Sequence, residues 1–513
     1  MAQVRVRGKL ALAQHTVIVA LFFASTAVFV LSEVANGGLG FPYDDSWIFA
    51  QYARNLAEGH GFCFNIGEPS NGFTSFLWLL LVALGYKLTG GFVVPMKVMG
   101  VAFGVGSVLM AYAVILTLTG DERRALWGSA LTALLPPLIV HSLAGMEGSL
   151  FVFIALLGLW AHLRRRDQPS QSWLWEGVLW GLAVWARPEN LLLWLLATVD
   201  KLRVCRQRGQ NPLMALRWLV VQIIVVAGFL LPWVSLNWQI TGTPYPCTYL
   251  AKVLPVRKVF YEHWGVGRGV VYALSVGLVY WLGDLVVLFP TFVALLLWEA
   301  LRQRTLLLPH RWLFAVALSL VSVQVVQFPA VPYILWAYHG RYLLPTYLLA
   351  GYALLCSLPF RRWTWVLGLV GVLVGWKFIL PEYAAGVKET HDLHVVFGQW
   401  LRQNTPIGSV VATHDIGAIG FFSQRRIFDT QGLIHVDIAL QLPRLHRDAD
   451  AMLEAMKKRR VSYLAAHERW FLVVERPDLF EPLKCGWGWN LKKDIRFCIY
   501  RIRWERWRHE AGR

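Results

Sequence analysis

The chain has 513 residues, of which 56% are hydrophobic and 16% are charged. Soluble domains carry about 25% charged residues, so most of this chain is not built to meet water. The formal net charge is +18, but the arginines gather in short loops between long apolar runs, which is how membrane proteins distribute them. Composition therefore predicts a polytopic α-helical membrane protein, surrounded by membrane lipids and carrying one smaller soluble part. It excludes nucleic acid as a partner.

The first apolar run, Thr16–Leu31, follows three basic residues. Basic flanks stay in the cytoplasm, so we predict a first transmembrane helix that leads outward, rather than a cleaved signal peptide. The next apolar run begins at Thr74 and is shorter than the roughly 20 residues that a span needs. We therefore predict that Thr74–Lys87 is an interfacial helix lying on the outer surface.

Further apolar runs alternate with basic loops, and each basic loop is predicted to be cytoplasmic. These loops are Arg123-Arg124, Arg164–Arg166, Lys201–Arg208, Arg302–Arg311 and Arg361-Arg362. The predicted spans are Thr16–Leu31, Pro95–Leu118, Leu126–Val140, Leu150–Leu163, Trp173–Ala186, Leu191–Val199, Leu216–Trp238, Val271–Leu301, Trp312–Phe328, Leu343–Leu358 and Trp363–Leu380. About eleven spans place the N-terminus in the cytoplasm and the C-terminus outside. Residues 1–380 form the predicted membrane module, with a long outer loop at 33–73.

Residues 381–513 have a different composition, with charges, histidines and short alternating runs. The runs that predict strands are Val410–Thr413 and Val461–Leu464. With a helix at His394–Arg402, they predict a small α/β domain on the outer face. Cys485 and Cys498 flank a turn-rich stretch and either bridge two strands or remain two thiols.

The outer loop contains two adjacent carboxylates, Asp44 and Asp45. The two negative charges repel each other, which costs free energy unless the pair binds a cation or one carboxyl group is a base with a raised pKa. The structural alternative is that Asp44 N-caps a helix at Ser46–Ala57 while Asp45 favours the helix dipole. The two interpretations are compatible, because a cap fixes the position of a carboxylate.

Other polar side chains fall at the predicted outer ends of helices. They are Glu147, Arg187, Glu189, Tyr249, Lys252, His339, Arg341 and Tyr342. Singly, each such group could be an interfacial side chain that reaches out to the headgroups. Together they bring cations that suit a phosphate, and carboxylates that suit an attacking hydroxyl, to one face of the membrane.

The C-terminal part contains candidate metal ligands: His391, His394 and the His414-Asp415 pair. Residues three apart on a helix share a face, as His391 and His394 would. No third ligand follows at a fixed spacing, so we expect these histidines to be structural or to lie at the surface.

The first-loop pattern Asp44-Asp45, Tyr52–Gly61, Asn65–Glu68 and Asn71–Thr74 resembles the first outer loop of GT-C integral-membrane glycosyltransferases. The resemblance is greatest to the terminal arabinofuranosyltransferases of cell-wall arabinan and their bacterial relatives. Later motifs occur in the order that family shows: Gly145–Glu147, Ala186–Glu189, Tyr249–Lys252, His339–Pro345, Trp400–Pro406 and His414–Gly417. Ser70 and Phe73 depart from the family pattern, which leaves the acceptor and the sugar open.

The resemblance implies a GT-C fold in a bacterial inner (plasma) membrane, with a polyprenyl-phosphate-sugar donor and inversion at the anomeric carbon. The acceptor would be a hydroxyl of a cell-envelope glycan or lipid. We expect Asp44 to be the base, or Asp45 if Asp44 is a cap. Glu147 and Glu189 would orient sugar hydroxyls, and Arg187, Lys252 and Arg341 would hold the phosphate. The remaining substrate contacts expected are Tyr52, Arg54, His60, Asn71, Tyr249, His339 and Tyr342.

No cofactor is certain, although Mg²⁺ or Mn²⁺ is compatible with the paired carboxylates. A rival hypothesis is a transporter or flippase of a lipid-linked glycan. A transporter should carry charges or broken helices near the middle of the bilayer. The predicted spans Pro95–Leu118, Leu126–Val140 and Leu216–Trp238 have no acidic residue, which counts against it.

Overall fold

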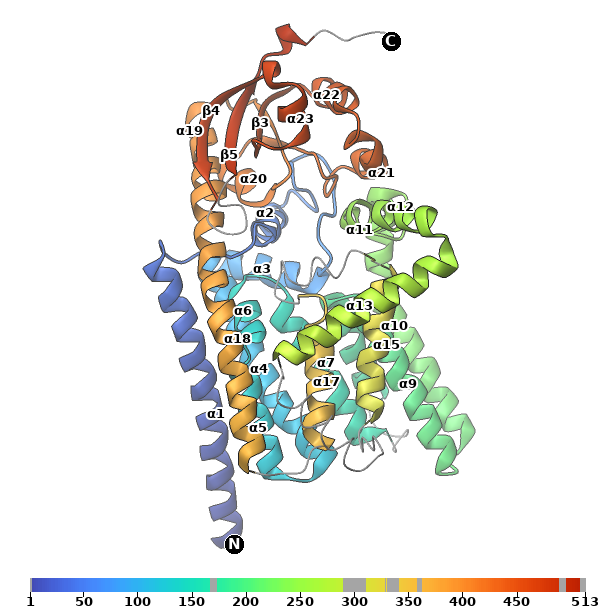
Figure 1. The fold of residues 1–513 in the computed structure, drawn as a ribbon. Helices are drawn as coiled ribbons and strands as arrows, with labels where there is room; N and C mark the ends of the chain where they lie inside the picture. The colour runs from blue at the N-terminus through green and yellow to red at the C-terminus, as the bar shows by residue number, and fades with distance from the viewer. Residues whose placement is uncertain are drawn as a thin grey trace.

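The structure is a computed structural model that describes residues 2–166, 173–288, 311–327, 329, 341–357, 362–488 and 495–507. It has two parts (Figure 1): a bundle of helices, and a sheet with its own helices, formed by the C-terminal residues at one end of the bundle. The far part of the predicted span Val271–Leu301 and most of the basic loop Arg302–Arg311 lie outside the described residues.

Within the described residues, six helices are long and apolar enough to cross a membrane. They are α1 (Ala2–Ala35), α4 (Val93–Thr119), α7 (Gly148–Arg165), α10 (Pro212–Thr241), α13 (Val266–Leu288) and α18 (Arg362–Glu389). Shorter helices complete the bundle: α3 (Phe76–Thr89), α8 (Trp173–Ala186), α9 (Asn190–Gln207), α15 (Arg311–Gln327) and α17 (Leu344–Ser357). This set is roughly consistent with the predicted eleven spans, and the chain is a multi-pass membrane protein.

The run predicted as a single span at Leu126–Val140 is instead two helices, α5 (Glu122–Ala133) and α6 (Pro136–Leu143), bent by 54°. The cause is the Pro136-Pro137 pair, which lacks backbone N–H donors and forces the preceding Leu135 into an extended conformation. The predicted span is therefore a bent pair of helices, which can still act as one broken span.

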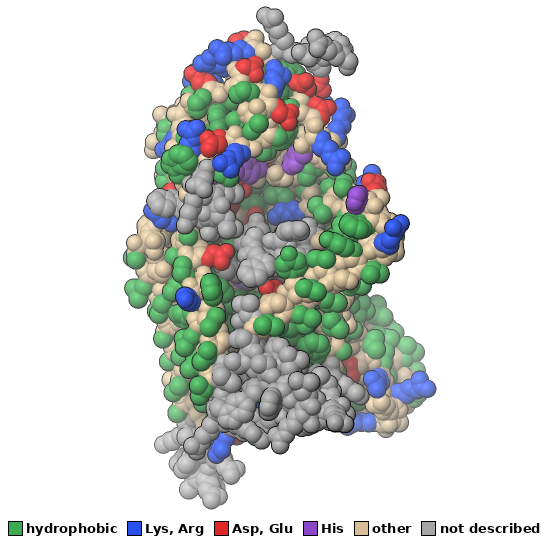
Figure 2. Space-filling view, in the orientation of Figure 1, with side chains coloured by type: hydrophobic (Ala, Val, Ile, Leu, Met, Phe, Trp, Pro, Cys, Tyr) green, Lys and Arg blue, Asp and Glu red, His purple; other side chains and the backbone are tan. Residues whose placement is uncertain are grey.

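The surface of the bundle is apolar. The exposed side chains of α10 include Leu213, Val220, Ile223, Ile224 and Leu231. Figure 2 shows hydrophobic side chains over much of the described lower body, whereas charged side chains gather on the C-terminal part. A soluble monomer would not expose an apolar surface of this extent, so these side chains face lipid.

Helix α3 is the predicted interfacial helix, and it begins two residues later than expected. The hydroxyl of Ser75 caps it by accepting from the backbone N–H of Trp78 at 3.3 Å, and Gly90 ends it with a φ of +71°. At 14 residues it is about 21 Å long. That is less than the roughly 30 Å of a bilayer core. It lies at the end of the bundle next to the C-terminal part (Figure 1).

A buried polar cluster joins three of the long helices near this end. Lys97 of α4 donates to Glu33 of α1 at 2.7 Å and to the carbonyl of Leu143 at 3.0 Å. The hydroxyl of Tyr383 on α18 also donates to Glu33. Because a buried charge is costly unless it is paired and hydrogen-bonded, this cluster fixes how α1, α4 and α18 pack.

The C-terminal part is a five-stranded sheet with helices. Its strands are β1 (Val410–Thr413), β2 (Arg426–Asp429), β3 (Val461–His467), β4 (Phe480–Trp487) and β5 (Arg496–Ile502), in the order β2-β1-β3-β5-β4. Strands β2, β1 and β3 are parallel, and β5 and β4 continue antiparallel. The helices are α19 (Val396–Asn404), α20 (Gly417–Ser423), α21 (Val436–Leu445), α22 (Ala449–Lys458) and α23 (Phe471–Glu475). The predicted strands and the α/β class are confirmed.

Two details refine the prediction. Cys485 of β4 lies opposite Cys498 of β5, and the two form a disulfide, so the bridging alternative holds. The proposed domain boundary at 380/381 falls inside α18, which continues through Pro381 to Glu389 and then into the π-helical turn η1 (Thr390–Val395). The two parts are therefore joined by a continuous helical segment.

The predicted orientation can be tested at Gly91, which follows α3 and has open space where a side chain would lie. In a background without the native free cysteines, Gly91→Cys should react with a membrane-impermeant thiol reagent in intact cells. Gln207→Cys, exposed at the end of α9 and predicted to be cytoplasmic, is the matched control and should react only after permeabilisation. The reverse labelling pattern would invert the topology.

Candidate active site

The loop at 33–73, called the first outer loop after its predicted orientation, lies between the bundle and the C-terminal part (Figure 1). Its helix α2 (Asp45–Ala57) packs against α20 through Trp47, whose ring lies 5.0 Å from that of Phe421 and 4.6 Å from that of Phe422. Further along the loop, Asn65 makes two hydrogen bonds of 2.9 Å with the backbone of Ile427 in β2. The loop and the C-terminal part therefore hold each other in place.

Asp44 does not cap its own helix, and in this respect the structural interpretation was wrong. It occupies the N-cap position of α2, but its side chain makes no capping hydrogen bond there. Its two carboxylate oxygens instead accept from the backbone N–H groups of Gly417 and Ala418, at 2.6 and 2.7 Å. Asp44 thus caps α20, an element more than 370 residues away in sequence.

The surroundings of Asp44 favour its neutral form. Burial, followed by the negative charge of Asp415, raises the pKa of the Asp44 carboxyl to about 7, and the two amide hydrogen bonds oppose this shift. His394 lies between the two carboxylates, 3.5 Å from Asp44 and 3.6 Å from Asp415. The first of the paired aspartates therefore belongs to the junction between the two parts of the molecule.

Asp45 points to different partners. Arg341 donates to its carboxylate at 2.9 Å, and the ammonium group of Lys252 lies 3.6 Å away. Burial raises the pKa of the Asp45 carboxyl, but Lys252 and Arg341 outweigh burial and hold that pKa below its usual range. Asp45 is therefore a carboxylate at neutral pH. Because Asp44 and Asp45 bind separate partners, they do not form one shared cation site.

Arg341 continues into a buried ionic network. It donates to Glu147 at 3.0 Å, and Arg187 donates to the same carboxylate oxygen at 2.5 Å. Arg187 also binds Glu189, at 3.1 Å through its Nε. Burial would raise the pKa of Glu147, but Arg341 and Arg187 lower it to about 2. With Asp45 and Lys252, the network holds three carboxylates and three cations.

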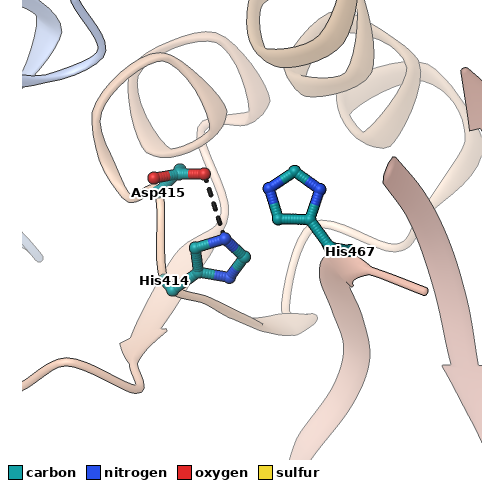
Figure 3. A group of neighbouring side chains, drawn as sticks. All are labelled: His414, Asp415 and His467. Carbon is teal, nitrogen blue, oxygen red and sulfur yellow. Dashed lines mark ion pairs between the residues drawn. The ribbon is translucent and has the colours of Figure 1, made fainter. Parts of the chain in front are cut away.

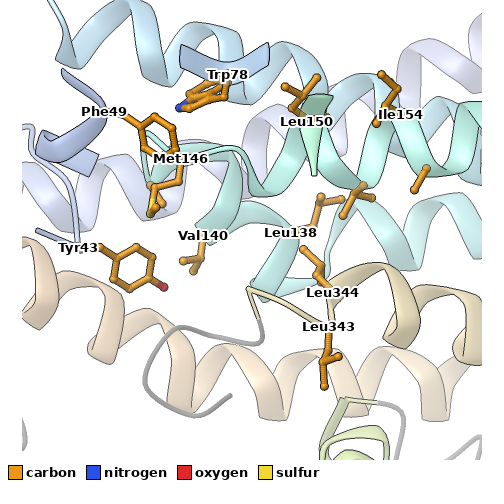
Figure 4. Close-up of a cluster of buried hydrophobic side chains, with 14 of the residues drawn as sticks. Tyr43, Phe49, Trp78, Leu138, Val140, Met146, Leu150, Ile154, Leu343 and Leu344 are labelled. Carbon is orange, nitrogen blue, oxygen red and sulfur yellow. The ribbon is translucent and has the colours of Figure 1, made fainter. Parts of the chain in front are cut away.

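The buried core beneath this network positions it. Met146, Leu150, Ile154 and Leu343 are among its side chains, which Figure 4 shows together with Trp78 of α3. Glu147 follows Met146 directly, and Arg341 lies two residues before Leu343. Since interiors are close-packed, the two charged side chains are held at fixed positions by their apolar neighbours.

A cavity of about 150 Å³ opens beside the network. The predicted site residues that line it are Asp45, Arg187, Glu189, Tyr249, Lys252, Arg341 and Tyr342. Leu433, which follows β2, also lines it, so both parts of the molecule contribute to the wall. The structure therefore brings these cations and carboxylates together around one cavity, and their roles stay predictions.

Sequence reasoning missed several polar residues of the wall. Gln324 and Gln327 line the cavity from α15, and Thr248 lines it from α11 (Cys247–Lys252). The Gln324 carbonyl and the Thr248 hydroxyl are buried and have no hydrogen-bond partner among the described residues. Two glutamines three residues apart share one face of a helix, so their place in an otherwise apolar span was the available signal.

Other predicted contacts lie behind the wall. Tyr52 is fully buried, and its hydroxyl accepts from the backbone N–H of Gly72 at 2.8 Å. A side chain at Gly72 would come within 2.9 Å of the Leu433 carbonyl, so only glycine fits there. Asn71 is also buried: it donates to Asn237 at 2.8 Å and accepts from the backbone of Cys247 at 3.0 Å. Both side chains position the loop that carries the wall.

The remaining predicted contacts are farther away. The guanidinium of Arg54 lies over the Phe421 ring, 4.3 Å from its centroid, at the junction with α20. His60 is exposed beside Glu58. Tyr249, by contrast, lines the cavity itself and stacks on Tyr245, with 4.5 Å between the ring centroids. His339 lies outside the described residues.

The fold is similar to that of several solved structures, as the resemblance in the sequence led us to expect. Among solved structures, ArnT from Cupriavidus metallidurans in the apo state matches with a TM-score of 0.55 at 12% identity, over 95% of this chain and 98% of that one. The same enzyme bound to undecaprenyl phosphate matches with a TM-score of 0.53 at 12% identity, over 94% of this chain and 97% of that one.

The oligosaccharyltransferase of Archaeoglobus fulgidus, in a complex with Zn and sulfate, matches with a TM-score of 0.51 at 15% identity, over 91% of this chain and 72% of that one. In sequence, residues 384–509 match a family described as a domain of unknown function (DUF8728). No curated protein matches the chain in sequence. Identities at this level establish the fold, and the activity has to be argued from the site.

Proposed function

We propose that the protein is an inverting glycosyltransferase that moves a sugar from a polyprenyl-phosphate donor to a hydroxyl of a cell-envelope glycan or lipid on the outer face of the membrane. One observation carries the proposal: the cavity brings Asp45 together with Lys252, Arg341 and Arg187. A base and a set of cations are what this reaction requires of a protein.

The cations suit the leaving group. A polyprenyl phosphate departs as an anion, so no general acid is needed, and Lys252 and Arg341 can hold it through charge-assisted hydrogen bonds. Both now bind Asp45. A phosphate would take over part of these contacts and leave the carboxylate available to the acceptor. The ArnT structure with undecaprenyl phosphate supports a donor of this kind, because that protein shares the fold.

The proposed reaction is a single displacement at the anomeric carbon. The acceptor hydroxyl attacks the anomeric carbon from the face opposite the phosphate, and its proton passes to Asp45. A new C–O bond forms as the bond to the phosphate oxygen breaks, which inverts the anomeric centre and releases polyprenyl phosphate. The buried Thr248 hydroxyl and Gln324 carbonyl, with Glu189 on the same wall, are suited to bind sugar hydroxyls. Glu147 acts indirectly, by holding the two arginines.

Asp45 is a better base than Asp44 on geometric grounds. Asp45 lines the cavity, whereas both oxygens of Asp44 accept backbone N–H groups of α20. A base must first be within reach of the proton, and its pKa is a second consideration. The pKa of Asp44, about 7, is better matched to the task, so the two criteria disagree and a direct comparison decides.

Asp45→Asn in purified protein should lower transfer by roughly 10²–10⁴-fold, the usual contribution of a general base, and leave donor binding in place. Asp44→Asn is the matched control: it makes the same substitution at the neighbouring carboxyl group, which does not line the cavity, and should cost less in transfer. Product formation by the purified protein in detergent, where there is no membrane to cross, also separates a transferase from a transporter. A larger loss in Asp44→Asn than in Asp45→Asn would reassign the base.

Lys252→Ala should weaken binding of undecaprenyl phosphate by about 1.5–3 kcal/mol, because a hydrogen bond to a charged group is lost. This corresponds to roughly a 10- to 150-fold increase in Kd. The control is Lys258→Ala, which removes an exposed lysine six residues further on, in α12 (Leu254–Trp264). Equal affinities in the two variants would remove Lys252 from the phosphate site.

A further inference from the structure

A second group of chemically active side chains lies in the C-terminal part, at one edge of its sheet. Strands β1 and β3 are parallel neighbours, with Thr413 paired to Ala465. The residues that follow Thr413 are His414 and Asp415, and β3 ends on His467. Because parallel strands end at the same edge, the fold brings the two histidines together although 53 residues separate them in sequence.

The three side chains converge. One potential ligand atom from each lies within 4.8 Å of the other two, and the His414 Nε2 is 3.1 Å from the Asp415 carboxylate. The imidazole rings of His414 and His467 are 5.2 Å apart, and Figure 3 shows the carboxylate and both rings around one space. All three are partly exposed, so an ion can reach them.

We propose that His414, Asp415 and His467 form a binding site for a divalent transition-metal ion, of which Zn²⁺ fits the ligands best. Two imidazoles and one carboxylate are a common zinc ligand set, with water completing the coordination, whereas Mg²⁺ and Ca²⁺ prefer oxygen ligands throughout. This site is separate from the paired aspartates, because it is formed by other secondary-structure elements and contains imidazole ligands.

The geometry requires a small adjustment. Zinc bonds of about 2.0–2.2 Å place the ligands of a tetrahedral site roughly 3.4 Å apart. Since the ligand atoms lie within 4.8 Å of one another, the most distant pair has to close by at most about 1.4 Å. Partly exposed side chains reach this by small changes of side-chain torsion. The alternative is a simple hydrogen-bonded His414-Asp415 pair with His467 beside it, and such a pair would not hold a metal tightly.

A metal ion at this site would lie next to the junction between the C-terminal part and the first outer loop. His394 contacts both Asp415 and Asp44, which caps α20 at the junction with the first outer loop. A cation at Asp415 would offset the charge of a carboxylate that now repels Asp44. The ion would therefore stabilise the junction between the two parts. The proposal does not depend on sugar transfer, and it can fail or succeed independently of it.

The test uses full-length protein purified in detergent with a tag that contains no histidine. After treatment with a chelator and dialysis against ZnCl₂, we expect about one zinc per chain by elemental analysis, unaffected by excess MgCl₂. His414→Ala and His467→Ala should each lower zinc affinity by at least tenfold. His391→Ala, which removes an exposed histidine outside the group, is the control and should bind like the unaltered chain.

A second readout guards against misfolded variants. ZnCl₂ should raise the Tm of the unaltered protein and of His391→Ala, and should leave that of the His414→Ala/His467→Ala double variant unchanged. If the alanine variants do not fold, His467→Gln gives the same comparison with a smaller change of shape. Full zinc binding by the folded double variant, or no zinc bound by the unaltered protein, overturns the proposal.

Discussion

The site depends on one constraint: charges taken out of water must be paired. Arg341 is 5% exposed and reaches Asp45 and Glu147 at once, and Arg187 is 2% exposed and reaches Glu147 and Glu189. Removing one partner of such a pair is strongly destabilising, because it leaves an uncompensated buried charge. The network therefore fixes the ends of several helices relative to one another. It also places two of its cations, Lys252 and Arg341, in the wall of the cavity.

The same constraint explains why two adjacent aspartates have different surroundings. Asp45 begins α2 and faces the cations of the membrane part, whereas Asp44 faces the amide groups of α20 in the C-terminal part. The first outer loop is consequently shared by both parts. A bound donor that drew Arg341 away from Asp45 would change the charge balance on one side of the loop, while the other side stayed attached to the sheet domain.

Much of this arrangement could be predicted, and the limits have physical causes. The span pattern could be predicted because hydrophobic length and basic loops are local features of the sequence. Lys252 and Arg341 were singled out from the sequence and line the cavity, and their role in holding a phosphate stays a prediction. The partner of Asp44 could not be predicted. Its hydrogen bonds to the backbone of residues 417 and 418 are tertiary contacts, which leave no local signature in the sequence. His467 was missed for the same reason: a ligand set assembled by strand pairing has no fixed spacing. Asn71 fitted the family pattern but is buried as a loop support.

The central claim is that the cavity beside Asp45 receives the phosphate of a lipid-linked donor. An experimental structure of the protein with bound undecaprenyl phosphate tests it most directly. We expect the phosphate oxygens within hydrogen-bond distance of Lys252 and Arg341, with the Asp45 carboxylate separated from at least one of its present cationic partners. A phosphate bound elsewhere on the bundle, with the contacts of Asp45 to Arg341 and Lys252 intact, would contradict the account.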